Sequence, residues 1–334
     1  MLLILSAPGD THSEAVEHIL ARRGIPFVHW NQAGFPERDT VTLRYDSSGL
    51  RSRTLAKMGE LIDLAQISTT YVRRYAHPDV RRPANDSSAR TYIEAEARAF
   101  LNGAAELIDC QWVPGPLRTL QWAGDKSWQL RLATQLGFEI PPTLITNDPS
   151  ELLEFYRQHN GHIICKAVNF PHFPSADGAD RWVFTTQLVT PRDAGYVDSV
   201  RHCPAIFQAY VPKRLELRVT VVGDRVFPCE IHSQATERTR YDWRRYDLEH
   251  TPHREHDLPD VIRARCIRIV RALGLCYGAM DLVLTPDGRY VFLEVNPMGQ
   301  YLWIEKITGM PISDAICDLL EAAEAGKGGM PGAG

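Results

Sequence analysis

Residues 280–297, MDLVLTPDGRYVFLEVNP, decide the fold expected of this chain. Two apolar runs flank a Pro-Asp-Gly segment, which is the pattern of a β-hairpin with a tight turn. If residues 286–289 form the loop, Thr285 pairs with Tyr290 across the two strands. The stretch therefore predicts a hairpin whose pairing register is set by its turn.

The same register brings oxygen-bearing side chains together at the end of the hairpin away from the turn. Asp281 falls directly opposite Glu294, and Asn296 shares the face of Glu294 because side chains alternate along a strand. The other face is expected to be apolar and to hold Leu282, Leu284, Leu293 and Val295. Two carboxylates this close repel each other unless a positive charge lies between them. Oxygen ligands at this density suit Mg²⁺ carrying the phosphates of a nucleotide, and the simpler alternative is a surface hairpin with incidental acids.

Length and composition predict a soluble protein of two or three domains, because 334 residues exceed one ordinary core. The net charge of −4 gives no reason to expect nucleic acid as the main partner. The apolar start, MLLILSA, lacks a basic segment and ends at Pro8, so it is expected to be a buried strand rather than a signal peptide. No run reaches the roughly 20 apolar residues of a membrane span, so no membrane partner is expected.

The seven cysteines indicate a reduced, cytoplasmic protein. Their number is odd, no pair has Cys-x-x-Cys spacing, and most lie in apolar runs such as Ile163-Ile164-Cys165. They are therefore expected to be small buried hydrophobes, with a catalytic thiol as the alternative.

The order of expected elements predicts an α/β (α+β) fold. One α/β layer is expected from strands at 2–6, 25–30, 41–46 and 67–72, with helices at 12–23 and 88–108. No Gly-x-Gly-x-x-Gly follows the first strand, so the dinucleotide fingerprint is absent. The expected boundaries give an N-terminal α/β domain (1–115), a central part with a long lid connection (116–205), a C-terminal part with the hairpin (206–325) and a disordered tail (326–334).

Two lysines in the middle of the chain have distinctive settings. Lys126 opens a helix that Asp125 is expected to cap, where the helix dipole favours anions. Lys166 lies in an otherwise apolar strand, where an unpaired ammonium group would be costly. Lys126 is thus either an anion ligand or a solvated helix residue, and Lys166 is either a ligand or part of an internal salt bridge.

The order of these parts resembles the ATP-grasp carboxylate ligases over residues 116–325. The matching segments are GDK at 124–126, ICKA at 164–167, QAYV at 208–211, ELR at 216–218, and Asp281 followed by EVN at 294–296. The resemblance implies an ATP-grasp fold behind an N-terminal pre-ATP-grasp domain. The lid departs from the family pattern, because residues 169–181 contain one glycine and several aromatic residues in place of a glycine-rich loop.

The resemblance also implies which residues bind the cofactors, ATP and Mg²⁺. ATP would be held by two lysines at its phosphates, a hinge strand at the adenine edge, an acid at the ribose and an arginine near the transferred phosphate. The lysines are Lys126 and Lys166, and the hinge strand is formed by Gln208, Ala209, Tyr210 and Val211. The acid is Glu216, and the arginine is Arg218. The metal ligands would be Asp281, Glu294 and Asn296. Lys126, Lys166 and Arg218 would serve catalysis, because cationic groups offset charge on a phosphoryl group in transfer to a carboxylate.

Within this superfamily, the finer resemblance is to the microviridin or graspetide maturases, the macrocyclases of ribosomal peptides. The matching segments are YVRR at 71–74, DKSWQL at 125–130, IPPTLITN at 140–147, VPKRLELRV at 211–219 and EIHSQ at 230–234. These enzymes join Asp or Glu side chains of a precursor peptide to Ser, Thr or Lys side chains, as macrolactones or macrolactams. The resemblance implies a ribosomal precursor peptide, with leader and core, as the partner, and it is compatible with a homodimer.

The polar stretch 232–256 fits the binding of an acidic peptide. It holds cationic and aromatic side chains suited to carboxylates, namely Arg238, Arg240, Tyr241, Trp243, Arg244 and Arg245. The alternative is a solvated loop whose charges bind nothing specific. The arginines of the helix expected at 259–273 are instead assigned to a solvated face, because they follow helical spacing.

Two other functions would use the same ATP site. One is an ATP-grasp ligase that adds an amino acid such as glutamate to a protein or small peptide. The other is a nucleotide-binding regulator that has lost the reaction, although binding alone does not require every expected metal ligand. Cyclisation removes water from the peptide, whereas amino-acid addition increases its mass, so the product separates the two ligases.

Overall fold

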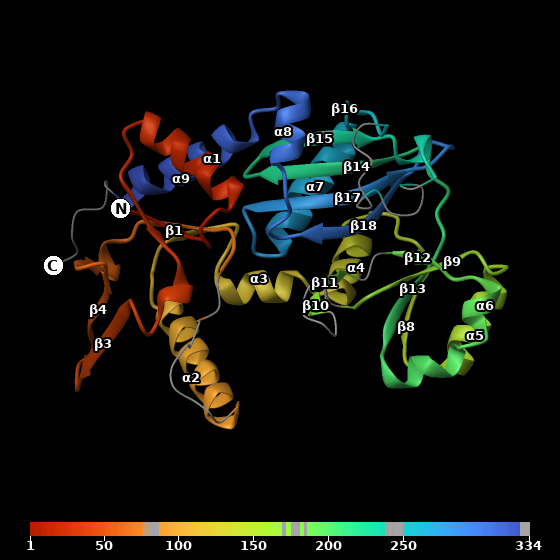
Figure 1. Ribbon diagram of the computed structural model, residues 1–334. Helices are drawn as coiled ribbons and strands as arrows, with labels where there is room; N and C mark the ends of the chain where they lie inside the picture. The colour runs from red at the N-terminus through yellow and green to blue at the C-terminus, as the bar shows by residue number, and fades with distance from the viewer. Residues whose placement is uncertain are drawn as a thin grey trace.

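The computed structural model describes residues 1–75, 78, 87–168, 172–174, 181–183, 186–237, 239, 243 and 250–327. They form one parallel sheet, two larger antiparallel sheets and two small antiparallel sheets, with helices packed around them (Figure 1). The mixed α/β class expected from the sequence is confirmed.

The N-terminal sheet is built from short apolar strands that pair in parallel. Its order is β2 (Phe27–Trp30), β1 (Leu2–Leu5), β6 (Thr69–Val72) and β7 (Gln111–Val113). Helix α1 (Thr11–Arg22) connects β1 to β2 and begins at Asp10, whose carboxylate accepts hydrogen bonds from the backbone N–H groups of His12 and Ser13. Strand β1 pairs with β2 on one side and with β6 on the other, so the strand order reverses at β1, and the carboxyl ends of β1 and β6 lie side by side at one edge of the sheet.

The strand expected at 41–46 is present, but it does not belong to the α/β layer. Strand β3 (Thr40–Asp46) pairs antiparallel with β4 (Gly49–Lys57), which pairs with β5 (Glu60–Asp63) in a separate sheet. The physical reason is the tight turn after β3. Gly49 has a φ of 116°, and Asp46 accepts a hydrogen bond from Ser48 N, so the chain reverses at once instead of crossing over through a helix.

The central sheet is antiparallel, in the order β12 (Gln187–Leu188), β9 (Ile163–Lys166), β13 (Ala205–Ala209) and β8 (Thr143–Thr146). Helix α5 (Pro149–Gln158) follows β8, with Asp148 as its N-cap and Pro149 at its first position, as expected. Helix α6 (Pro191–Ala194) follows β12. A small pair, β10 (His172–Pro174) and β11 (Arg181–Val183), lies between β9 and β12 in the sequence.

The fifth sheet carries the hairpin. Its order is β16 (His253–Glu255), β15 (Arg225–Ile231), β14 (Leu215–Val222), β17 (Tyr277–Leu284) and β18 (Tyr290–Asn296). Strands β14 and β17 are buried along their whole length. Helix α7 (Asp260–Ala272) buries Ile262, Cys266 and Ile269 against this sheet, which confirms the apolar face expected from helical spacing.

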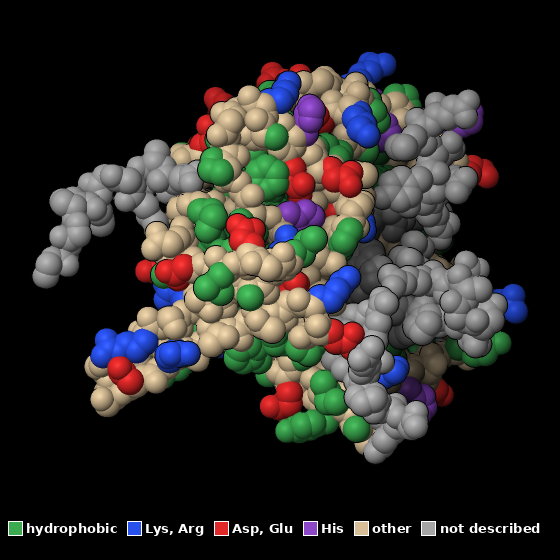
Figure 2. Space-filling model, turned by 60° about the vertical axis from the view of Figure 1, so that its left-hand side comes forward, with side chains coloured by type: hydrophobic (Ala, Val, Ile, Leu, Met, Phe, Trp, Pro, Cys, Tyr) green, Lys and Arg blue, Asp and Glu red, His purple; other side chains and the backbone are tan. Residues whose placement is uncertain are grey.

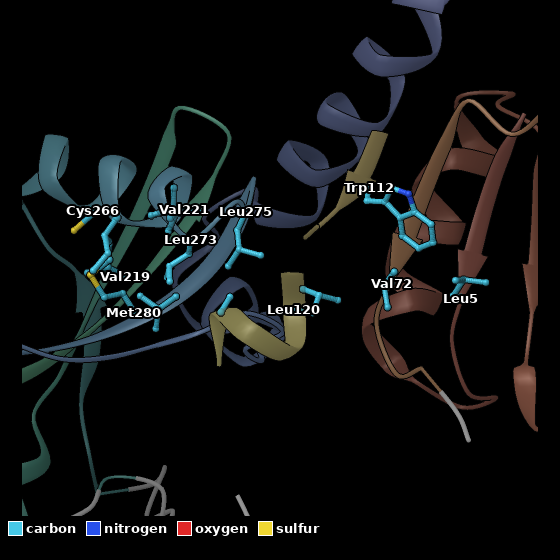
Figure 3. Close-up of a cluster of buried hydrophobic side chains, with 14 of the residues drawn as sticks. Leu5, Val72, Trp112, Leu120, Val219, Val221, Cys266, Leu273, Leu275 and Met280 are labelled. Carbon is cyan, nitrogen blue, oxygen red and sulfur yellow. The ribbon is translucent and has the colours of Figure 1, made fainter. Parts of the chain in front are cut away.

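A continuous apolar core joins the N-terminal sheet to the hairpin sheet. Figure 3 shows Leu5, Val72 and Trp112 on one side, Val219 and Met280 on the other, and Leu120 between them. Leu120 belongs to α3 (Leu117–Ala123), which lies between the two blocks in Figure 1. Burial of each large apolar side chain contributes about 1.5–3 kcal/mol, so this core fixes the two sheets to each other.

The remaining helices are α2 (Ser87–Glu106), α4 (Lys126–Gln135), α8 (Leu302–Thr308) and α9 (Ile312–Lys327). Helix α9 packs its buried Ile312 and Ile316 in one cluster with Leu2, Ile4 and Val16 of the N-terminal sheet and α1. The C-terminal helix thereby closes the N-terminal layer. Among the described helices, none combines the length and apolarity needed to cross a membrane.

Candidate active site

The hairpin has the expected pair of opposed acids, but the strand pairing near its turn differs from the expected pairing. Asp281 lies opposite Glu294, which confirms the prediction. Near the turn, however, Leu284 rather than Thr285 pairs with Tyr290, so the loop is longer than expected. The register shifts by one residue between Asp281 and Leu282, and this β-bulge restores the alignment of the acids.

The bulge corrects one expectation about the faces of β18. Leu293 was expected on the apolar face, but it is only partly buried and lines the pocket beside Glu294. Phe292 takes its place in the core, opposite Leu282, with its ring 5.5 Å from that of Phe138. The extra residue on the bulged strand is the physical reason, because it shifts the alternation of side chains by one position.

The three expected metal ligands form one cluster. The amide Nδ2 of Asn296 lies 3.3 Å from Asp281 Oδ2 and 3.5 Å from Glu294 Oε1. Both carboxylates are more than 90% buried. Arg218 Nη1 lies 3.3 Å from Asp281 Oδ1, and Lys126 Nζ lies 3.8 Å from Glu294 Oε2. Two cations therefore offset two buried acids, which desolvation alone would strongly disfavour.

This donor set fits a hard divalent cation. The two orientations of the Asn296 amide exchange its nitrogen and oxygen, and rotation would direct its oxygen toward both carboxylates. No cluster of three or more His, Cys, Asp or Glu side chains within the described residues can hold a metal ion. Two carboxylates and one amide would hold Mg²⁺ and leave it room to bind phosphate oxygens and water as well.

The acids face a hollow of about 540 Å³, part of it open solvent, between the central sheet and the hairpin sheet. Most of the expected site residues line it, namely Lys166, Gln208, Ala209, Tyr210, Val211, Glu216, Trp243, Asp281 and Glu294. Three more of the expected residues, Lys126, Arg218 and Asn296, contact the lining acids as described above. Site residues that are spread between positions 126 and 296 of the sequence thus lie at one pocket.

The two lysines approach the pocket from different elements. Lys126 is the first residue of α4, and Asp125 caps that helix by accepting from Trp128 N, as expected. Lys126 Nζ also donates to Ala167 O at 2.9 Å, which ties α4 to the end of β9. Lys166 is the last residue of β9, and its strand pairing with Ile206 leaves its side chain at the pocket wall.

Two buried oxygens on the pocket wall have no hydrogen-bond partner within the described residues. They are Gln208 Oε1 and Glu216 Oε2. Their companion atoms are occupied, because Gln208 Nε2 donates to Thr143 Oγ1 at 2.9 Å and Glu216 Oε1 accepts from Lys213 at 2.8 Å. A buried acceptor without a donor costs about 1–3 kcal/mol, so these atoms mark places where a ligand can donate.

Of the side chains expected to bind peptide, only Trp243 can be placed, since Arg238, Arg240, Tyr241, Arg244 and Arg245 lie outside the described residues. Trp243 is buried, and its ring centre lies 4.9 Å from the guanidinium carbon of Arg218 and 5.2 Å from the ring of Trp303. This stacking orients the Arg218 guanidinium by a cation–π interaction. Trp243 therefore forms part of the pocket wall and packs against the guanidinium of Arg218.

Gln129 has a positioning role that the sequence reasoning missed. From the buried face of α4, its amide accepts from Val295 N at 2.8 Å and donates to Val295 O at 2.7 Å. Val295 lies between Glu294 and Asn296, so Gln129 fixes the backbone that presents two of the expected metal ligands. The available signal was a glutamine at a helical position where the spacing calls for an apolar residue.

The segment EIHSQ contributes a polar group outside the pocket. Glu230 accepts from His256 Nδ1 at 2.7 Å and from His232 Nε2 at 2.9 Å. Burial raises the pKa of Glu230, but these hydrogen bonds outweigh burial and hold the pKa below its ordinary value. Glu230 pairs with Leu217, whereas Arg218 pairs with Cys229, so Glu230 lies on the sheet face away from Arg218.

Comparison with solved structures identifies the family. The RiPP-associated ATP-grasp ligase of Chryseobacterium gregarium, solved with ADP and a leader and core peptide, is 27% identical, with a TM-score of 0.86 over 96% of each chain. The macrocyclase MdnB of Microcystis aeruginosa MRC is 30% identical, with a TM-score of 0.78 over 96% of this chain and 98% of MdnB. The chain belongs to the ATP-grasp ligases. The resemblance inferred from the sequence is confirmed.

Other comparisons place this ATP-grasp ligase more broadly. No family model matches the chain. The D-alanine--D-alanine ligase of Dechloromonas aromatica (strain RCB) is 24% identical over 208 residues, or 59% of this chain. The match spans 64% of the length of that curated relative.

On the face of the ATP-grasp ligase seen in Figure 2, the described acidic and basic side chains are interspersed and do not form separate acidic and basic patches.

Proposed function

We propose that this ATP-grasp ligase closes crosslinks within a ribosomal precursor peptide. The enzyme would activate Asp or Glu side chains of the peptide with ATP and join them to Ser, Thr or Lys side chains. The observation that carries the proposal is the likeness to a macrocyclase and to a peptide-bound ligase over almost the whole chain. The ATP pocket alone would suit any member of the family, so the whole-chain likeness is what favours a peptide substrate.

The pocket supports ATP as the nucleotide. The hinge strand β13 would face the adenine edge, where the free Oε1 of Gln208 suits the exocyclic amine of adenine. The free Oε2 of Glu216 suits a ribose hydroxyl. Lys126 and Lys166 would contact the phosphates from α4 and β9. At the hinge, Gln208 would thus supply a side-chain acceptor for adenine.

Asp281, Glu294 and Asn296 would hold Mg²⁺ with the nucleotide phosphates. When bound, the ion supplies positive charge to the β- and γ-phosphate oxygens. Arg218, oriented by Trp243 and paired with Asp281, would stabilise charge on the phosphoryl group during transfer.

The reaction would proceed through an acyl phosphate. A peptide carboxylate oxygen attacks the γ-phosphorus of ATP, and the bond from that phosphorus to the β,γ-bridging oxygen breaks to release ADP. A peptide hydroxyl or amine then attacks the activated carbonyl, loses its proton, and expels inorganic phosphate. The residues described here supply binding and charge, and this route needs no covalent intermediate on the protein.

The test combines a cognate precursor peptide, ATP and Mg²⁺ with the purified enzyme. Peptide-dependent ADP release and a product lighter by one water per bond are expected. A product that gains an amino acid would instead establish an amino-acid ligase. Absence of ADP release with a precursor verified in its native gene cluster would identify a nucleotide-binding regulator.

A further inference from the structure

The turn that follows the metal strand is packed against Asn296 itself. Gly299 N donates to Asn296 O at 3.1 Å, which closes a turn directly after β18. A Cβ atom at Gly299 would lie 2.3 Å from Ala279 Cβ and 3.2 Å from Asn296 Cβ, so the position admits no side chain. Movement of this turn would therefore displace Asn296.

The carbonyl groups of this turn are held by two buried side chains. Arg73, which follows β6 of the N-terminal sheet, donates from Nη1 to Met298 O and, at 3.3 Å, to Gly299 O. Tyr277, the first residue of β17, donates its hydroxyl to Gly299 O at 2.6 Å. Burial raises the pKa of Tyr277 to about 12, so its hydroxyl keeps the proton that it donates.

The next residues along the chain are held from α1. His12 Nε2 accepts hydrogen bonds from Tyr301 N at 3.2 Å and Leu302 N at 3.4 Å. Asp10, which caps α1, lies 3.7 Å from Arg73 Nε and 3.0 Å from Arg74 Nε. Three residues that follow the ends of β1 and β6, Asp10, His12 and Arg73, thus form a polar clamp that holds residues 298–302.

We propose that Arg73 is a positioning residue for the metal ligand Asn296, acting through the turn at 296–299. This inference rests on the proposed function, because it assumes that Asn296 binds the metal. The N-terminal sheet would then complete the metal site without touching the ion, by fixing the backbone that carries the third ligand. Residues that orient metal ligands typically change metal affinity about 10- to 100-fold when removed.

The test measures Mn²⁺ binding in the presence of ADP, by the free-Mn²⁺ electron paramagnetic resonance signal, in Arg73→Met. About tenfold weaker Mn²⁺ binding is expected, with ADP affinity in metal-free buffer unchanged. Arg73→Lys, which keeps the charge and one donor direction, should recover part of the affinity. The matched control is Arg74→Met, which also removes an arginine beside Asp10 but is 60% exposed and, in the described part of the chain, does not bond to the turn; it should bind Mn²⁺ normally.

A double variant separates this inference from the proposed function. In an Asn296→Ala background, Arg73→Met should cause no further loss, because the ligand that it positions is absent. Normal Mn²⁺ binding by Arg73→Met, or an equal loss in both backgrounds, would overturn the positioning role while the metal site stands. Normal Mn²⁺ binding by Asn296→Ala itself would overturn the metal assignment and this inference with it. If Arg73→Met does not fold, Tyr277→Phe removes one donor to the same carbonyl and carries the same expectations.

Discussion

Gln208 and Glu216 each present one satisfied and one unsatisfied buried polar atom to the pocket. In each case a neighbour holds the satisfied atom, Thr143 for Gln208 Nε2 and Lys213 for Glu216 Oε1, so the unsatisfied oxygen is fixed in place. A fixed acceptor distinguishes ligands by their hydrogen-bonding groups, since it favours an amine, which donates, and disfavours a carbonyl, which only accepts. Adenine presents an amine at the position where guanine presents a carbonyl oxygen.

We expect Gln208→Leu to raise the KM for ATP about tenfold, because one hydrogen bond in a buried site is lost. The preference for ATP over GTP should narrow, which steady-state ADP and GDP formation with the same peptide would measure. The exposed Gln158→Leu on α5 is the control and should leave both values unchanged. If Gln208→Leu prefers ATP over GTP as strongly as the unmodified enzyme does, Gln208 does not contact adenine.

Gln129→Leu keeps the volume of the side chain but leaves Val295 N–H and C=O without their partner. We expect the free energy of unfolding to fall by about 2 kcal/mol, the typical cost of unsatisfied buried groups. Urea unfolding followed by circular dichroism measures it. Gln135→Leu, exposed on the same helix, should change the free energy of unfolding little. An equal effect of both variants would show that helix propensity, rather than the hydrogen bonds between Gln129 and Val295, is responsible.

At the scale of elements, the sequence predicted the hairpin itself, because its turn residues and two flanking apolar runs are local signals, but the expected pairing of Thr285 with Tyr290 was wrong. Asp281 and Glu294 were placed opposite each other correctly. The bulge at Leu293 was not predictable, because one extra residue in a strand leaves no periodic signal. Strand β3 was assigned to the wrong layer for a related reason, since the residues of a strand do not specify which strand it pairs with. The polar clamp joins residues almost 300 positions apart, which no local pattern reports.

The polar clamp makes the free energy of unfolding depend on pH through His12 of α1. Burial, then the charge of Arg73, lowers the pKa of His12 to about 4, against 6.5 in the unfolded chain. Between these values the unfolded state binds the proton and the folded state does not, so stability falls as pH decreases from about 6.5 to about 4. His12→Gln keeps an acceptor that does not titrate, so its free energy of unfolding should fall less steeply over this range.

Urea unfolding at several pH values checks this slope. The control is His18→Gln, on the same helix but exposed, which should follow the unmodified protein. Parallel curves for His12→Gln and the unmodified protein would show that His12 does not titrate differently in the folded state.

At the scale of the whole molecule, the hairpin that carries the proposed metal ligands is not an isolated feature. Its sheet shares one apolar core with the N-terminal sheet, and α9 closes that sheet from the far end of the described chain. The likeness to MdnB and to the Chryseobacterium gregarium ligase likewise covers 96% of this chain in each case, rather than the ATP pocket alone. Asp281 and Glu294 therefore lie on a sheet that is held by a large core, and a substitution among the proposed metal ligands is expected to remove the reaction without removing the fold.

We expect Glu294→Gln to abolish ADP formation while the protein stays folded. The substitution keeps the shape of the side chain but removes a charge paired with Lys126 and an expected metal oxygen. ADP formation and the thermal unfolding midpoint, measured on the same preparation, separate the two effects. Normal turnover by Glu294→Gln would show that the metal assignment is wrong.

The most direct measurement of the central claim is the mass of a cognate precursor peptide after incubation with the enzyme, ATP and Mg²⁺, recorded with the ADP released. Crosslinking by this ATP-grasp ligase predicts loss of one water and release of one ADP for each bond formed, with none in Glu294→Gln. A peptide of unchanged or increased mass, from a precursor verified as cognate, would contradict it.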